Sequence, residues 1–265
     1  MYLAIDIGGT KTLIALIDDR RSIRNSIRFP SNHDQARFFE ELNQNIRTNF
    51  SLDNLKAIVV AIPGPVENNR PVWFANLPWD DLDFAPKLKK LSNAPIFFEN
   101  DANLAGLAEA ENLPGKSIYL TFSTGIGGSI IIDGKIDSEN PNFEPGHEKY
   151  EFKGETIEWE DFASAKAVSE AFGKYTHDIT KKTDWVQISC RIAAGLRSIV
   201  YNHSPDQIIF GGPLGLELKK YQKPLEKQLS VCLPDCISVP KFSTAKYKHE
   251  SVLYGCYLYA KSKER

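Results

Sequence analysis

The sequence predicts an α/β fold that is divided into two lobes. Close to the N-terminus, two apolar runs flank a glycine turn, and a helical pattern and a buried strand follow, which is the element order of an α/β lobe. After a break at Pro114-Gly115, a second pair of apolar runs again flanks a glycine-rich turn. A chain of 265 residues also exceeds the length that one core usually covers. These observations predict lobes at residues 1–115 and 116–247.

Apolar spacing predicts the elements of the first lobe. Leu42, Ile46 and Phe50 recur at helical spacing, whereas the β-branched run Ala57–Ile62 ends at Pro-Gly-Pro, as a buried strand does. The expected strands are Tyr2–Ile7, Thr12–Ile17, Ala57–Ile62 and Pro95–Phe98, and the expected helices are Asp34–Phe50 and Ala102–Glu111.

The same spacing rules predict the elements of the second lobe. Residues Asn140–Glu160 are polar, charged and proline-bearing, and we expect them to form a functional or mobile loop. The expected strands are Ile118–Phe122, Ser129–Ile132 and Gln207–Phe210, and the expected helices are Trp159–Tyr175, Val186–His203 and His249–Lys261.

Composition disfavours several classes of partner. The net charge of -2, with scattered lysines and arginines, predicts no nucleic-acid partner and no membrane surface. The sequence has no apolar run of membrane-spanning length, and its N-terminus does not read as a signal peptide. Four cysteines without metal-finger spacing are typical of free thiols in a reducing compartment. We therefore expect a cytoplasmic protein.

The first glycine turn has the chemistry of a phosphate site. Gly8 and Gly9 let backbone N–H groups approach phosphate oxygens, while Thr10 adds a hydroxyl donor and Lys11 a positive charge. Asp6, at the end of its strand, can hold Mg²⁺ through water. A simple hairpin turn is the alternative interpretation. The spacing of a P-loop is absent.

Two further glycine loops follow strands later in the chain. Thr124, Gly125 and Gly127 belong to the second loop, and Gly211-Gly212 form the third. Three such loops, in the first, middle and last parts of the chain, are hard to explain as independent turns. A cleft that grips a phosphate chain explains all three.

Taken together, the motifs resemble the ROK family (repressors, open reading frames and sugar kinases). The resemblance implies an actin-like ATPase fold, with two ribonuclease H-like lobes around a central nucleotide cleft that binds ATP with Mg²⁺. It also implies that the last helix, at 248–265, joins the first lobe. The stretches that carry it are Asp6–Thr12, Ala61–Val66, Glu99–Asn103, Ser123–Gly128, Glu144–His147 and Ile208–Gly212.

Asp101 is the strongest candidate for a catalytic residue. Phosphoryl transfer to a hydroxyl needs a carboxylate that takes the hydroxyl proton. Taken alone, Asn-Asp before a helix is more often a helix cap. The resemblance places Asp101 at the catalytic base of the family and Asn100 at a contact to a sugar hydroxyl.

The resemblance also implies a sugar pocket. Such a pocket needs side chains that donate and accept hydrogen bonds. The residues it indicates are Gly64, Asn76, Asn100, Asp101, Glu144, His147 and Glu160. Glu158 is an alternative to Glu160, because both precede the next expected helix.

One departure from the family pattern concerns zinc. Many ROK proteins join the histidine of the E-x-G-H stretch to three cysteines in a C-x-C-G-x-x-G-C-x-E pattern. Between His147 and Glu160 this chain has no cysteine, so no tetrahedral thiolate site can form there. We expect no structural zinc, and we expect packing of Phe152 and Trp159 to hold the loop.

The sequence thus predicts an ATP-dependent kinase that phosphorylates a hexose hydroxyl, most closely resembling a glucokinase. The alternatives are a catalytically weak sugar-binding sensor, a polyphosphate-using kinase and an N-acetylhexosamine kinase. A repressor is disfavoured because the first phosphate loop begins at residue 6, which leaves no room for a helix-turn-helix domain. A hexose is the expected partner, and a homodimer is left open.

Overall fold

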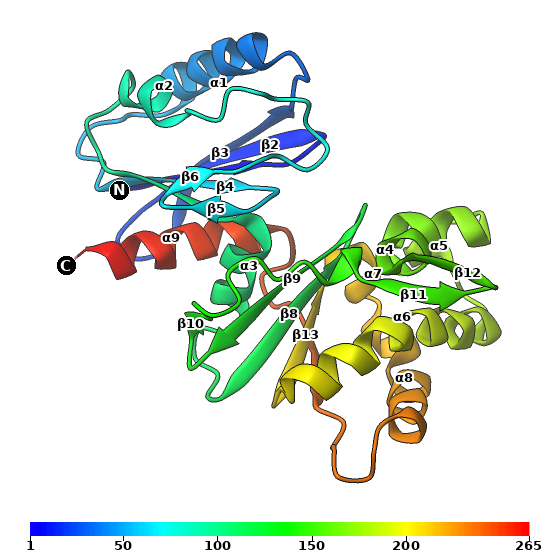
Figure 1. Cartoon of the computed structure of the whole chain (residues 1–265). Helices are drawn as coiled ribbons and strands as arrows, with labels where there is room; N and C mark the ends of the chain where they lie inside the picture. Colours follow the sequence, from blue (N-terminus) through cyan, green and yellow to red (C-terminus); the bar gives the residue numbers. More distant parts are fainter. Residues whose placement is uncertain (265) are drawn as a thin grey trace. The chain divides into compact units, whose positions relative to one another are not determined.

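The computed structural model describes residues 1–264 as two compact units (Figure 1). Unit 1 comprises Met1–Ala108 together with the C-terminal segment that starts at Glu250, and unit 2 comprises Glu109–His249. Each unit is built on its own mixed sheet. Across residues 1–264, no helix has both the length and the apolar content that crossing a membrane requires.

The sheet of unit 1 has the strand order β3-β2-β1-β4-β7. Its first three strands are antiparallel neighbours, while β4 and β7 run parallel to β1. Strand β3 was missed by the sequence analysis, because it is a polar edge strand whose side chains are mostly exposed. The strands are β1 (Tyr2–Ile7), β2 (Lys11–Ile17), β3 (Ile23–Pro30), β4 (Ala57–Ile62) and β7 (Ile96–Asn100).

Alternating side chains of this sheet enter two different cores. Leu3 and Ile5 face α1, whereas Tyr2 and Ala4 pack against the other face, where Leu253 of α9 is buried. Figure 1 shows α1 and α2 on one side of the sheet and α9 on the other. The helices are α1 (Gln35–Asn49), α2 (Ala85–Lys89), α3 (Asp101–Glu109) and α9 (Ser251–Lys263), and a short hairpin joins β5 (Val66–Glu67) to β6 (Arg70–Pro71).

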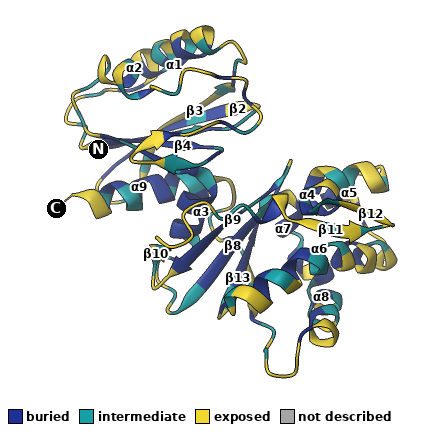
Figure 2. Ribbon diagram, viewed as in Figure 1, coloured by how far each residue is buried: buried dark blue, intermediate teal, exposed yellow. Residues whose placement is uncertain are grey.

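The sheet of unit 2 has the strand order β10-β9-β8-β13-β14. Strands β8, β13 and β14 are parallel, and β8 to β10 form an antiparallel meander. In Figure 2 the strands are largely dark blue, which marks them as the buried layer. The strands are β8 (Lys116–Phe122), β9 (Ile126–Ile132), β10 (Lys135–Ile136), β13 (Gln207–Gly211) and β14 (Lys241–Thr244).

The helices of unit 2 pack their apolar faces into one core with this sheet. Helix α8 was missed by the sequence analysis, since Pro224 lies inside it and reads as a helix breaker. The elements are α4 (Trp159–Ala163), α5 (Ala165–Phe172), α6 (Lys182–His203), α7 (Gly212–Gly215), α8 (Leu218–Cys232), and the 3₁₀ turns η1 (Pro145–His147), η2 (Thr176–Asp178) and η3 (Lys248–Glu250).

Two expectations for this unit were wrong. The stretch expected as a loop at Asn140–Glu160 contains η1 and a hairpin of β11 (Lys149–Phe152) and β12 (Glu155–Glu158). Its strands carry charged, exposed side chains, so no apolar alternation marks them. The helix expected at Trp159–Tyr175 is two helices, because Ser164 adopts an extended conformation that ends α4, and its hydroxyl caps α5.

Candidate functional site

The first glycine turn of unit 1 is packed against the loop that carries Asn76. The Gly8 N–H donates to the Lys11 carbonyl over 3.0 Å, which closes the turn. A Cβ on Gly9 would lie 2.9 Å from the Cβ of Asn76. A larger residue would therefore separate the two segments. The structure brings together a residue expected at the phosphates and one expected at the sugar.

Ser31, which follows β3, holds this turn through hydrogen bonds. Its hydroxyl donates to the Gly8 carbonyl over 2.6 Å and lies 2.9 Å from the Thr12 hydroxyl. Its backbone N–H donates to the Thr10 carbonyl. Because these partners are distant in sequence and two of the three are main-chain atoms, no motif marks Ser31, and the sequence analysis missed it. Thr10 and Lys11 remain exposed at the surface.

Asp6 is the second-to-last residue of β1, and only Ile7 separates it from the glycine turn. Burial raises the pKa of its carboxyl group to about 6, although Arg28 and Lys11 oppose this by favouring the ionised form. A nearby cation stabilises the ionised form of a carboxylate that is shielded from water. Mg²⁺ is usually held by one or two carboxylates together with substrate phosphates, so the Asp6 carboxylate is of the donor type that Mg²⁺ takes.

At the junction of β7 and α3, one residue caps the helix and the next supplies a carboxylate. The Asn100 Oδ1 accepts from the Asn103 N–H over 3.1 Å, which is an N-cap hydrogen bond, and the Asn100 Nδ2 donates to the Gly64 carbonyl over 3.2 Å. Asp101 is the first residue of α3 and is half-buried. Asn100, rather than Asp101, therefore caps the helix.

Gly64 joins this junction to the segment before Asn76. A Cβ on Gly64 would lie 2.3 Å from the Trp73 carbonyl oxygen, so only glycine allows the two backbones to approach this closely. The Ala75 N–H also donates to the Pro63 carbonyl over 2.7 Å. Gly64, Asn76 and Asn100 are thus part of one connected surface of unit 1.

In unit 2, Glu160 contacts the second glycine loop. Its Oε2 accepts from the Ile126 N–H over 3.0 Å, and a Cβ on Gly125 would lie 2.4 Å from the same oxygen. A Cβ on Gly146 would lie 2.8 Å from it. The E-x-G-H stretch and the glycine loop therefore meet at one carboxylate. Thr124 is exposed in this loop, and Gly127 pairs with Thr121 of β8.

His147 is paired with the other candidate carboxylate, Glu158. The His147 Nδ1 lies 2.9 Å from the Glu158 Oε2. This hydrogen bond raises the pKa of the imidazole, desolvation opposes it, and the charges of Glu160, Glu158 and Glu144 reinforce it. Glu144 is half-buried at the start of η1. Glu158 and Glu160 thus have different hydrogen-bond partners, the His147 ring and the Ile126 N–H.

The zinc pattern of the family does not fit this loop. Ligand-type atoms of His147, Glu158 and Glu160 lie within 4.8 Å of one another. However, Glu158 is engaged by the imidazole and Glu160 by the Ile126 N–H. We therefore assign the group to hydrogen bonding. The cysteines lie elsewhere in the chain, at positions 190, 232, 236 and 256.

Packing holds the hairpin that carries Glu158. Trp159 is fully buried, its indole N–H donates to the Arg191 carbonyl over 3.0 Å, and a Cβ on Gly195 would lie 2.2 Å from its ring. Phe152 stacks on Phe162 with ring centroids 4.4 Å apart. The expectation that Phe152 and Trp159 hold the loop is confirmed.

The third glycine loop lies beside the second. Gly211 ends β13, and Gly212 begins α7 with a positive φ of 72°. A Cβ on Gly212 would lie 2.4 Å from the carbonyl oxygen of Phe122, the last residue of β8. Since β8 and β13 are parallel, their carboxyl ends share one edge of the sheet, where ligands of α/β folds commonly bind.

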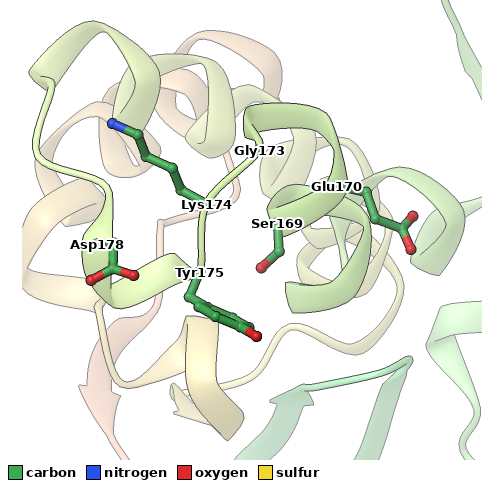
Figure 3. A pocket seen from close by; sticks show the side chains of 6 residues that line it. All are labelled: Ser169, Glu170, Gly173, Lys174, Tyr175 and Asp178. Atoms are coloured by element: carbon green, nitrogen blue, oxygen red, sulfur yellow. The ribbon is translucent and has the colours of Figure 1, made fainter.

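A cavity of about 400 Å³ lies between the end of α5 and η2 in unit 2. Helix α7 contacts both α5 and η2, which carry the cavity walls. In Figure 3 the Ser169 side chain points toward the ring of Tyr175, whereas Lys174 extends away from it. The sequence analysis missed this cavity because it placed the segment inside one helix. The lining residues are Ser169, Glu170, Gly173, Lys174, Tyr175 and Asp178.

Comparisons with known proteins agree over nearly the whole chain. The model of the ROK family matches residues 2–263. A fructokinase from Lactococcus lactis subsp. cremoris is 25% identical over 266 residues, which cover 93% of this chain and 89% of the relative. The ROK hexokinase from Thermus thermophilus is 25% identical with a TM-score of 0.77, and 98% of this chain and 99% of that chain are covered.

A second solved structure has a similar fold. A ROK family glucokinase from Streptomyces griseus, in complex with glucose and AMPPNP, has a TM-score of 0.82 at 19% identity, with 98% of this chain and 99% of that chain covered. These structures confirm the α/β, two-lobed actin-like fold that the sequence predicts. Since the family model and the fold both extend over nearly all of the chain, the chain belongs to the ROK family.

Proposed function

We propose that this ROK-family sugar kinase transfers the γ-phosphoryl group of ATP to a hydroxyl of a hexose, with glucose as the first candidate. The observation that carries the proposal is the junction of β7 and α3. There Asn100 caps the helix and donates to the Gly64 carbonyl, and Asp101 follows it at the first position of α3. A carboxylate placed in this way suits a general base.

In the proposed reaction, the Asp101 carboxylate takes the proton of the acceptor hydroxyl as its oxygen bonds to the γ-phosphorus. The bond between that phosphorus and the bridging oxygen breaks, and ADP leaves. The products are a sugar phosphate, ADP and the proton first held by Asp101. Such transfer depends mainly on positioning and charge stabilisation, so the remaining residues serve to bind and orient.

The glycine turns would hold the phosphates. The Gly8 N–H is used to close the turn, so Gly8 would shape the loop while the Gly9 main chain approaches the phosphates, and the exposed Thr10 and Lys11 would add a hydroxyl and a positive charge. Thr124, Gly125, Gly127, Gly211 and Gly212 would do the same in unit 2. Asp6 would hold Mg²⁺ through water, and the ion when bound neutralises phosphate charge.

Each unit contains its own candidate residues for the sugar. Asn76, Gly64 and Asn100 form the connected surface of unit 1. Glu144, His147 and Glu160 would contact hydroxyls from unit 2. Glu160 uses its Oε2 for the Ile126 N–H. Its other oxygen would accept from the sugar.

The cavity at Tyr175 would receive the nucleoside end of ATP. It lies beside α7, which begins at Gly212, so a triphosphate held at the third glycine loop would direct its nucleoside there. The Tyr175 ring stacks on His177 with centroids 5.7 Å apart, and because 71% of the residue is exposed, it would still offer aromatic surface to a base. Use of ATP, together with free thiols, agrees with a cytoplasmic location.

The test is a panel of hexoses and N-acetylhexosamines crossed with ATP and polyphosphate, with the sugar phosphate measured directly. We expect turnover with ATP and at least one hexose, and loss of turnover in Asp101→Asn. Sugar binding by calorimetry without turnover, for every donor, would instead identify a sensor. Turnover with polyphosphate and none with ATP would contradict the assignment of the nucleoside cavity.

A further inference from the structure

The contact of His147 with Glu158 lies at the open end of the β11–β12 hairpin, where the chain enters β11 and leaves β12. His147 ends η1, immediately before β11, and Glu158 ends β12. The register pairs Lys149 with Glu158, which places the end of β12 beside the residues just before β11. The contact of 2.9 Å between Nδ1 and Oε2 is therefore a consequence of strand pairing.

Glu158 stands at a position where the zinc pattern of the family has a cysteine. In the zinc pattern of the family, the last cysteine stands two residues before the final glutamate. With Glu160 as that glutamate, the cysteine position is occupied here by Glu158. A carboxylate thus contacts the histidine directly where a metal-bound thiolate would stand, so zinc is not required to connect the two.

We propose that Glu158 is a positioning residue that holds the His147 imidazole with its proton on Nδ1 and leaves Nε2 as the ring nitrogen for the hexose. This inference rests on the proposed function, in which His147 contacts the sugar. An ionised carboxylate can only accept a hydrogen bond, so the Nδ1 atom must carry the proton. The neutral ring then presents Nε2 as an acceptor, and the protonated ring presents it as a donor.

The groups around His147 determine how firmly this state is held. Glu144 at the start of η1, Glu158 at the end of β12 and Glu160 in α4 all act on the imidazole, and all three favour its protonated form. Glu160 is oriented separately by the Ile126 N–H. Glu158 accepts from Nδ1, so its removal should release the ring.

The first experiment observes the ring without any substrate. Long-range ¹H–¹⁵N spectra of labelled protein report the tautomer and pKa of each histidine, and His147→Asn identifies the relevant signal. We expect the Nδ1-protonated form in the native chain, a lower pKa in Glu158→Gln, and a changed tautomer in Glu158→Ala. Glu155→Gln, which removes a charge from the same strand, should leave both unchanged. An identical tautomer and pKa in Glu158→Ala would overturn the proposal.

The second experiment measures the kinetic consequence. Glu158→Ala should raise the sugar KM by roughly 5–50-fold with kcat nearly unchanged, the range expected for one lost charge-assisted hydrogen bond. Glu158→Gln should recover part of this, since its amide oxygen still accepts from Nδ1. Circular dichroism melting of both variants shows whether the hairpin is intact. An unchanged sugar KM in a folded Glu158→Ala chain would overturn the positioning role.

Two further outcomes separate this inference from its alternatives. Equimolar Zn²⁺ should leave the His147 signals of the native chain unmoved, and a shift that Glu158→Gln abolishes would identify a metal site and overturn the proposal. A native chain that phosphorylates no sugar would overturn the proposed function. The ring spectra would in that case still support or reject Glu158 as the residue that positions His147.

Discussion

The side-chain amide of Asn100 donates to the carbonyl oxygen of Gly64 over 3.2 Å and so connects the start of α3 to the loop after β4. Gly64 in turn lies against the Trp73 carbonyl, where an added Cβ would approach within 2.3 Å. Both partners are backbone or buried groups that cannot move without disturbing the sheet. This contact makes Gly64 the best position for a stability test of the candidate sugar surface.

Gly64→Ala should destabilise the chain by about 1–3 kcal/mol, the usual cost of forcing atoms into a packed site. Gly154→Ala is the matched control. A Cβ added at Gly154 would have no atom within 4 Å, so this variant has only the cost of a positive φ of 85°. Urea unfolding measures both. Equal losses in the two variants would contradict the close approach at Gly64.

Asp101→Asn should fold normally and lose roughly 10²–10⁴-fold in kcat, the usual worth of a general base. Folding should be retained because Asn100 performs the capping of α3. Asp161→Asn is the control, since it removes an exposed carboxylate from the first turn of α4. Steady-state kinetics and thermal melting measure both effects. Turnover near that of the native chain would remove Asp101 from the mechanism.

Tyr175→Ala should raise the KM for ATP by roughly 3–30-fold, because stacking of a base on an aromatic ring is worth about 1–3 kcal/mol. The sugar KM should change little. Tyr201→Ala is the control, as this tyrosine is also exposed but lies on α6. Kinetics at saturating sugar provide the comparison. A rise in the sugar KM alone would place the cavity at another ligand.

The pair of His147 and Glu158 should make stability depend on pH. The pKa of His147 is raised in the folded chain, so the ion pair contributes stability below the ordinary histidine pKa. That contribution is lost as the pH rises through the folded pKa. Because 48% of the His147 side chain is exposed, the contribution should be at most about 1 kcal/mol.

Urea unfolding between about pH 5 and about pH 9 tests this dependence, with Glu158→Gln compared to the native chain. The variant should lose stability mainly at the acidic end of the range, so the difference between the two chains should shrink as the pH rises. A difference that grows toward alkaline pH would show that the ring is held in its neutral form.

The purified chain should hold no stoichiometric zinc. The cysteine-free stretch after His147 lacks the thiolates of the family site, and packing of Trp159 and Phe152 supports the hairpin instead. Elemental analysis measures the metal content. A chelator, followed by excess Mg²⁺, should leave turnover and the melting temperature unchanged. About one zinc per chain, removed together with activity and restored by zinc alone, would contradict this.

Local signals explain what was predictable. The apolar runs at Tyr2–Ile7 and Ala57–Ile62, the glycine turns, and the placement of Asp101 directly after a strand are all visible within a few residues of sequence. Side-chain periodicity and the conformational freedom of glycine act over that range. The predicted α/β fold is confirmed, and the individual site residues stay predictions until they are tested by mutation.

The sequence by itself therefore determined the fold class, the apolar strands of both sheets, the position of the glycine turns and the absence of cysteine after His147. Only the tertiary structure decided which side chains meet. The partner of His147 follows from the β11–β12 register, the contact of Glu160 with the Ile126 N–H follows from the packing of α4, and the Tyr175 cavity follows from the cap at Gly173. These relationships depend on backbone pairing between segments that are distant in sequence, so no local pattern of residue types could specify them.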